Sequence, residues 1–175
     1  MRLIIVAGMP GAGKEEFLTA AREEGLAFVR MGDLVRDCYV VSGAEAQGLS
    51  LGQYANVQRE TEGKDIWARR AMSKATDDIF LIDGCRSMDE VRSFRALGGN
   101  TEIIAIHASP AVRFDRLVRR AREDAPRNQT EFEARDSREL AWGLGEVIAL
   151  ADYMLDNMSS VEDFHLKATA LLRSL

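Results

Sequence analysis

The 175-residue sequence predicts an α/β fold in which a five-stranded parallel sheet is flanked by helices. Short apolar runs alternate with longer amphipathic stretches along the chain, which is typical of a doubly wound sheet with right-handed crossovers. The first run, Leu3–Ala7, has no polar interruption, as expected for a strand buried on both faces. No internal repeat or low-complexity segment divides the chain, so we expect a single domain over residues 1–175.

Each predicted element has a local reason in the sequence. The strands are expected at Leu3–Ala7, Leu26–Arg30, Ile79–Ile82, Glu102–Ala108 and Tyr153–Leu155. The helices are expected from the glycine-rich stretch to Gly25, over Asp33–Val41, over Leu51–Ala75 with Gly63 as a candidate break, from Ser87, from Ser109-Pro110, from Thr130 and over Val161–Leu175. Ser87-x-x-Glu90 has the pattern of a capping box. Apolar stripes at helical spacing include Leu97, Val118 and Leu140 and are predicted to face the core.

The composition indicates a soluble globular protein, with 46% hydrophobic and 29% charged residues. No apolar run approaches the length needed to span a membrane, and Leu3–Ala7 is too short for a signal peptide. Cys38 and Cys85 stand far apart without metal-ligand spacing, so we expect free thiols in a reducing, cytoplasmic compartment. The net charge of −5 argues against nucleic acid as a partner. Nothing in the sequence selects an oligomeric state.

The stretch after the first strand has the spacing G-x-x-x-x-G-K of a phosphate-binding loop. It consists of Gly8, Met9, Pro10, Gly11, Ala12, Gly13 and Lys14. A buried strand before the loop and a helix after it are what a P-loop needs, because loop amides and the helix N-terminus hold the phosphates while the lysine reaches the β- and γ-phosphates. We therefore predict a three-layer P-loop NTPase fold that binds ATP with Mg²⁺.

Two acidic positions bear on the predicted magnesium site. The P-loop lysine is followed by Glu15 and Glu16 instead of the usual Ser or Thr. Glu15 has two interpretations: a water-mediated metal contact, or a first-turn carboxylate favoured by the helix dipole. Asp83 ends the third predicted strand, where a carboxylate can hold Mg²⁺ or its waters, although an aspartate before glycine is also a common turn residue.

Arginines are concentrated in the second half of the chain. Eight arginines and no lysine occur from Arg113 to Arg138. Arginine suits bidentate contacts to phosphate, whereas the intervening acidic residues equally fit a solvated helix face. Arg113, Arg116 and Arg120 recur at helical spacing, so we expect one helix to present them together.

Three motifs in the N-terminal half resemble adenylate kinases. Gly8–Lys14 is similar to the adenylate-kinase P-loop, proline included, and Gly32-Asp33-Leu34-Val35-Arg36 resembles the start of the acceptor-binding helix. Asp83-Gly84-Cys85-Arg86 resembles the family's Asp-Gly-x-Pro-Arg, shortened by one residue. The resemblance implies that Arg36 and Arg86 hold the acceptor's phosphate. It implies an acceptor-binding helical segment at about residues 32–76 whose substrate contacts are Gly32, Asp33, Arg36, Arg59, Gly84 and Arg86.

The C-terminal half extends the resemblance. Arg116 lies where nucleoside monophosphate kinases begin their lid, and Arg135-Asp136-Ser137-Arg138 resembles the returning lid arginines, which implies a short lid at about 116–138. Residues 151–157 look like the end of dephospho-coenzyme A kinases, which implies that Asn157 lies near the donor adenine. As a whole, the chain resembles an archaeal group of adenylate-kinase-related P-loop proteins.

The leading hypothesis is a kinase that transfers the γ-phosphoryl of ATP to an AMP-like nucleoside monophosphate. Its catalytic residues would be Lys14, Asp33, Arg116, Arg120, Arg135 and Arg138. The alternatives are a P-loop ATPase or nucleotide-sensing regulator, and a phosphotransferase like dephospho-coenzyme A kinase. With a hydroxyl acceptor, Asp33 is the best-placed general base; with a phosphate acceptor it would instead orient Arg36 or bind water on the metal.

Overall fold

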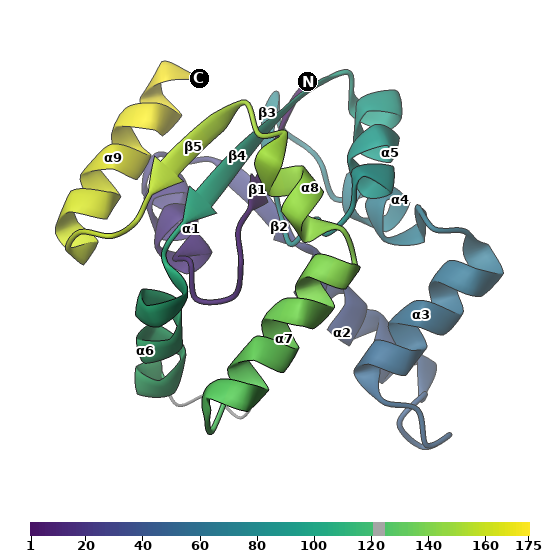
Figure 1. The fold of residues 1–175 in the computed structure, drawn as a ribbon. Coiled ribbons are helices and arrows are strands. Elements are labelled where there is room, and N and C mark those ends of the chain that lie inside the picture. The colour runs from purple at the N-terminus through teal and green to yellow at the C-terminus, as the bar shows by residue number, and fades with distance from the viewer. Residues whose placement is uncertain (121–124) are drawn as a thin grey trace.

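A computed structural model describes residues 1–120 and 125–175 of the chain. Five strands form one parallel sheet in the order β2-β3-β1-β4-β5, with helices on both faces (Figure 1). The strands are β1 (Arg2–Ala7), β2 (Ala27–Arg30), β3 (Ile79–Asp83), β4 (Asn100–His107) and β5 (Tyr153–Asp156). The predicted α/β fold with a five-stranded parallel sheet is therefore confirmed.

Two hydrophobic clusters cover the two faces of the sheet. The helices are α1 (Lys14–Glu23), α2 (Met31–Ser42), α3 (Leu51–Glu62), α4 (Ile66–Met72), α5 (Met88–Gly98), α6 (Pro110–Arg120), α7 (Gln129–Ala141), α8 (Leu144–Ala149) and α9 (Val161–Ser174). Leu3 and Ile5 of β1 pack with α2, α4, α5 and α8, whereas Ile4 and Val6 pack with α1 and α9. Strand side chains alternate between faces, so an unbroken apolar run serves both clusters.

Glycines divide two of the predicted helices. Gly63, at φ +103°, separates α3 from α4 as the sequence suggested, and Gly143, at φ +101°, separates α7 from α8. The helix from Thr130 was predicted to be continuous, with Leu140 facing inward. That prediction was wrong, because the chain turns at Gly143 and Leu140 is 52% exposed at the end of α7.

Two further predictions of burial were wrong. Leu97 lies near the end of α5 and is half exposed, because Gly98 and not Leu97 faces the sheet there: a Cβ on Gly98 would overlap Leu3 of β1. Val118 is exposed because α6 extends beyond the carboxyl end of the sheet (Figure 1). There the helix buries only a narrow face, formed by Arg113 and Leu117 among its described residues. Arg113 was expected to be presented beside Arg116 and Arg120, but its side chain is buried.

Most of the two segments predicted to bind the acceptor and to form the lid lies toward the carboxyl ends of the strands, whereas α4 packs beside α5 in the core on one face of the sheet (Figure 1). The proposed acceptor segment covers α2, α3 and α4, and the proposed lid covers the end of α6 and most of α7 (Figure 1). Lid residues 121–124 lie outside the described part of the chain. Within the described part, no helix is long and apolar enough to cross a membrane.

A histidine joins the last helix to the P-loop helix. His165 of α9 places its ring nitrogens 2.6 Å from Glu16 Oε1 and 2.9 Å from Glu23 Oε2, both on α1. The hydrogen bond to Glu16, with the charge of Glu23, raises the pKa of His165 above its usual value. The protonated ring therefore stabilises the packing of α9 on α1.

We expect replacement of His165 by glutamine to make stability less dependent on pH. Because the folded pKa is raised, the charged His165 stabilises the fold fully below its unfolded pKa of about 6.5, and this contribution is lost as pH rises through the folded value. Urea unfolding should show the largest gap between wild type and H165Q at the acidic end. Lys167→Gln, on the exposed side of α9, is the control, and an equal gap at pH 5.5 and 8.5 would contradict the assignment.

Candidate active site

A cavity of about 500 Å³ opens at the carboxyl ends of the central strands, where ligands bind in parallel α/β sheets. The predicted site residues that line it are Gly8, Pro10, Gly11, Gly13, Lys14, Glu15, Glu16, Gly32, Asp33, Asp83, Gly84, Arg86, Arg116, Arg120, Arg135 and Asn157. Five others lie outside its lining: Met9, Ala12, Arg36, Arg59 and Arg138. The fold thus gathers residues from six separate stretches of sequence into one site.

The glycine loop is closely packed against its surroundings. Gly11 and Gly13 have φ of +82° and +111°, a region that side chains strongly disfavour. A Cβ on Gly11 would lie 2.8 Å from the Arg113 carbonyl oxygen, and one on Gly13 would overlap Asn157 Nδ2. Met9 and Ala12 hold the loop from behind, where the Ala12 amide donates to the Met9 carbonyl at 3.0 Å. The backbone is therefore left to face the cavity.

Lys14 and Asp83 are two buried charges at the floor of the cavity. Lys14 Nζ donates to the Gly8 carbonyl at 2.7 Å. Burial lowers the pKa of Lys14, an effect that Asp83 and Glu139 oppose, and burial raises the pKa of Asp83, an effect that Lys14 opposes. The charged form of each group therefore carries a desolvation cost, which a bound phosphate or cation would offset.

Asp83 fits a magnesium site better than the other predicted ligand does. Its Oδ1 is buried and lacks a hydrogen-bond partner among the described residues, so it is available to a cation or a cation's water. The described residues contain no cluster of three or more His, Cys, Asp or Glu side chains suited to a metal. Magnesium usually binds one or two carboxylates together with substrate phosphates, which one carboxylate in this cavity can satisfy.

The two glutamates that begin α1 are engaged with basic side chains. Glu15 Oε1 lies 2.6 Å from Arg30 Nη2, and Glu16 contacts His165 as described above. Glu15 also raises the pKa of Asp83 electrostatically, so its charge acts within the site. Arg30, at the end of β2, lines the cavity and was not predicted from the sequence, although it ends a strand two residues before Gly32-Asp33.

Asn157 connects the P-loop to two distant elements. Its Nδ2 donates to the Ala12 carbonyl at 2.8 Å, while Arg116 Nη2 donates to its Oδ1 at 3.1 Å and to its backbone carbonyl at 3.0 Å. Asn157 is only 4% exposed. The residue predicted to lie near the donor adenine thus supports the phosphate loop from below, and it still borders the cavity.

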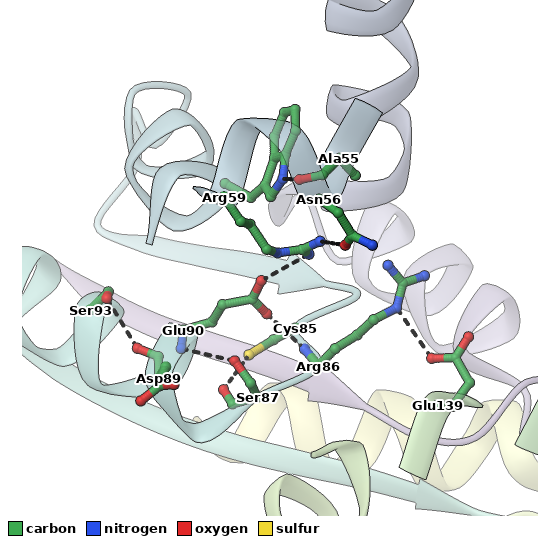
Figure 2. Close-up of polar contacts among 11 residues, drawn as sticks. Ala55, Asn56, Arg59, Cys85, Arg86, Ser87, Asp89, Glu90, Ser93 and Glu139 are labelled. Carbon is green, nitrogen blue, oxygen red and sulfur yellow. Dashed lines mark hydrogen bonds and ion pairs between the residues drawn. The ribbon is translucent and has the colours of Figure 1, made fainter. Parts of the chain in front are cut away.

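The three arginines and the aspartate predicted for the acceptor site occupy different places. Arg86 lines the cavity and donates from Nε to Glu139 Oε2 at 3.2 Å (Figure 2). Arg36 pairs with Asp33 at 2.9 Å, and both side chains are more than half exposed. Arg59 lies behind the Arg86 loop, 3.5 Å from Glu90 (Figure 2). Of the three arginines, only Arg86 is aimed at the cavity.

Helix α7 contributes one predicted residue and one unexpected one. Arg135 and Glu139 line the cavity, whereas Arg138 is exposed and points elsewhere. Glu139 follows Arg135 by four residues, which places both on one helix face, and this spacing could have revealed it. Trp142, directly after α7, is 45% exposed, and the Arg86 guanidinium lies 5.0 Å from its ring centroid.

Asp136 anchors α7 to the donor side of the site. The buried Arg113 donates to both carboxylate oxygens of Asp136, at 2.8 and 2.5 Å, and to the Pro10 carbonyl at 3.2 Å. The arginine predicted to be displayed for phosphate is therefore a structural link between α6, α7 and the P-loop. A bidentate pair of this kind holds its partners in a defined orientation.

The chain was compared with known proteins by sequence. A family model described as an AAA domain matches residues 4–140. A UPF0200 protein from Hyperthermus butylicus is 47% identical over 176 residues, which cover 99% of this chain and 94% of that protein. The UPF0200 protein Ta0179 from Thermoplasma acidophilum is 43% identical over 171 residues, with 97% and 94% of the two chains covered.

Solved structures share the fold at low sequence identity. TT1252 from Thermus thermophilus superposes with a TM-score of 0.68 at 16% identity, covering 99% of this chain and 97% of that one. A gluconokinase from Sinorhizobium meliloti 1021 superposes with a TM-score of 0.60 at 14% identity, covering 99% and 92%. These matches confirm a P-loop kinase-like fold. Together with the close sequence relatives, they show that the chain belongs to the archaeal UPF0200 family of P-loop proteins with an AAA domain.

Proposed function

We propose that the protein is an ATP-dependent phosphotransferase that moves the γ-phosphoryl group of ATP to a nucleoside monophosphate such as AMP. The observation that carries the proposal is that one cavity holds the P-loop lysine, the carboxylate of Asp83 and the arginine of the predicted acceptor motif, Arg86. Two cationic side chains from separate segments, Lys14 and Arg86, in one cavity suit the phosphates of a donor and an acceptor that meet there. The P-loop kinase-like fold supports the same reaction class.

The donor's phosphates would lie along the glycine loop. The loop amides and the N-terminus of α1 supply hydrogen bonds and positive potential, and the buried Lys14 adds a full charge. Asp83 would hold Mg²⁺, which when bound neutralises phosphate charge. Arg116 and Arg120 of α6 border the same space and would stabilise charge on the moving phosphoryl group.

A phosphate acceptor needs no general base in this site. The bond between the γ-phosphorus and the β–γ bridging oxygen breaks, and a bond forms from that phosphorus to an oxygen of the acceptor's ionised phosphate, which leaves ADP and a nucleoside diphosphate. Asp33 is exposed and paired with Arg36, an arrangement that suits an orienting role. Cys85 is buried beside the cavity, where burial raises the pKa of its thiol, so it stays neutral and is a poor nucleophile.

A coupled assay for ADP tests the proposal directly. ATP and Mg²⁺ are supplied with AMP, CMP, UMP or dephospho-coenzyme A, or without any acceptor. We expect ADP to form rapidly only with a nucleoside monophosphate, and the nucleoside diphosphate to appear in equal amount. ADP production that does not depend on an acceptor would indicate an ATPase, and production with dephospho-coenzyme A alone would indicate transfer to a hydroxyl group.

We expect Arg86→Ala to raise the KM for the nucleoside monophosphate by about 10- to 100-fold. This is the loss associated with a charge-assisted hydrogen bond of about 1.5–3 kcal/mol. The KM for ATP should change far less, because Arg86 lies on the acceptor side. Arg92→Ala removes an exposed arginine of α5 that pairs with Asp89 and is the matched control. An unchanged acceptor KM in R86A would contradict the assignment of the acceptor site.

We expect Asp83→Asn to weaken magnesium-dependent ATP binding by about tenfold while the nucleotide-free protein stays folded. The substitution keeps the shape of the side chain and removes a charge that burial disfavours, since burial raises the pKa of Asp83. Calorimetric titration with a non-hydrolysable ATP analogue, with and without Mg²⁺, measures the first effect, and urea unfolding measures the second. A large loss of stability would show that Asp83 has a structural role instead.

A further inference from the structure

Glu139 of α7 brings a carboxylate into contact with the proposed acceptor arginine. Its Oε2 lies 3.2 Å from Arg86 Nε, and its side chain is only 12% exposed. Figure 2 shows the two side chains reaching toward each other from separate segments of the chain. Because carboxylate and phosphate oxygens use the same guanidinium donors, Glu139 occupies a position where an acceptor's phosphate would bind.

Arg86 is held in place by a second, buried carboxylate on the opposite side. The Arg86 amide donates to Glu90 Oε2 at 2.8 Å, and the Glu90 side chain is 3% exposed (Figure 2). Ser87 Oγ accepts from the Glu90 amide at 3.2 Å, as the predicted capping box requires, but the carboxylate of Glu90 is directed to Arg86 and Arg59. The ring of Trp142 supports the guanidinium. Arg86 is therefore anchored, and Glu139 is the partner that is free to leave.

The two anions cannot share the arginine without repulsion. A phosphate on Arg86 would lie next to the Glu139 carboxylate, and like charges at that distance in a half-buried site repel strongly. The charge of Glu139 also opposes the lowering of the Lys14 pKa by burial. This carboxylate therefore offsets positive charge at both Arg86 and Lys14. In the absence of nucleotide, this carboxylate compensates charge that phosphates would otherwise compensate.

We propose that Glu139 is a built-in counter-anion of Arg86 that the acceptor's phosphate displaces. The proposal rests on the proposed function and assigns Glu139 as a positioning residue that sets acceptor affinity. Displacement would release α7 from the acceptor side while Asp136 still ties it to Arg113 and the P-loop. Arg135, one residue before Asp136, would then close over the phosphates from a helix anchored at the donor side.

Glu139→Gln tests the proposal, since it keeps the shape of the side chain and removes its charge. Calorimetric titration with AMP in the absence of ATP should show about tenfold tighter binding than in wild type. Adenosine, which has no phosphate, should bind both proteins equally. Glu133→Gln makes the same charge change on an exposed position of α7, where Glu133 contacts Gln129, and should leave AMP affinity unchanged.

A second variant and a kinetic readout keep the test decisive. Glu139→Ala should also bind AMP more tightly, and urea unfolding checks that both variants are folded. Weaker or unchanged AMP binding in folded variants would overturn the proposal. A kcat lowered more than about 100-fold at unchanged AMP affinity would also overturn it, because that result would mark Glu139 as a proton acceptor. If wild type binds AMP but the variants bind it no better, only this proposal fails. If neither binds AMP, the proposed function fails with it.

Discussion

The contact between Gly13 and Asn157 is the constraint on which the site depends. The Asn157 amide fills the space that any side chain at Gly13 would need, and it hydrogen-bonds the Ala12 carbonyl from the far end of the sequence. Arg116 then joins α6 to the same asparagine. The loop is thereby held against the turn after β5, and its backbone faces the cavity. Rigid placement of donors before a ligand arrives is what makes a phosphate site effective.

The charges of the cavity are arranged at a cost to the nucleotide-free protein. Lys14 and Asp83 lie deep in the cavity, and burial shifts the pKa of each toward its neutral form. Opposite charges in such a setting contribute little to stability, because desolvation offsets much of their attraction. Their value lies in what they offer a ligand: an ammonium for phosphate oxygens and an orphaned carboxylate oxygen for a cation.

The proposed acceptor side follows a different principle, in which one arginine is held between two carboxylates of unequal burial. Glu90 is nearly inaccessible and bonds to the backbone of Arg86, so it orients the loop and also receives Arg59 from α3. Glu139 comes from α7 and contacts the guanidinium of Arg86 through its Oε2. Glu90 is therefore suited to orient Arg86, whereas Glu139 is suited to give way to a ligand. The movement that would accompany acceptor binding would then take place in α7.

Local patterns in the sequence predicted most of the architecture. Unbroken apolar runs marked the strands, and the glycine-lysine spacing placed the P-loop between the first strand and α1, as the structure has it. Burial at helix ends was predicted less well. Leu140 and Val118 have the right spacing for a core position, yet they are exposed, because periodicity gives the side of a helix but not how far the neighbouring layer extends.

The sequence by itself determined which residue types are present to bind phosphate and where the backbone must turn. Only the tertiary structure decided which of the many arginines face the cavity. Arg86 lines the cavity, whereas Arg113 forms a buried ion pair with Asp136 and Arg36 pairs with Asp33 on the surface. Glu139 becomes a site residue in the same way, and Asn157, which the sequence had marked, is seen only there to support the P-loop. The reason is physical: a charged side chain takes its role from the partner it meets, and Arg86 and Glu139 are 53 positions apart in the chain.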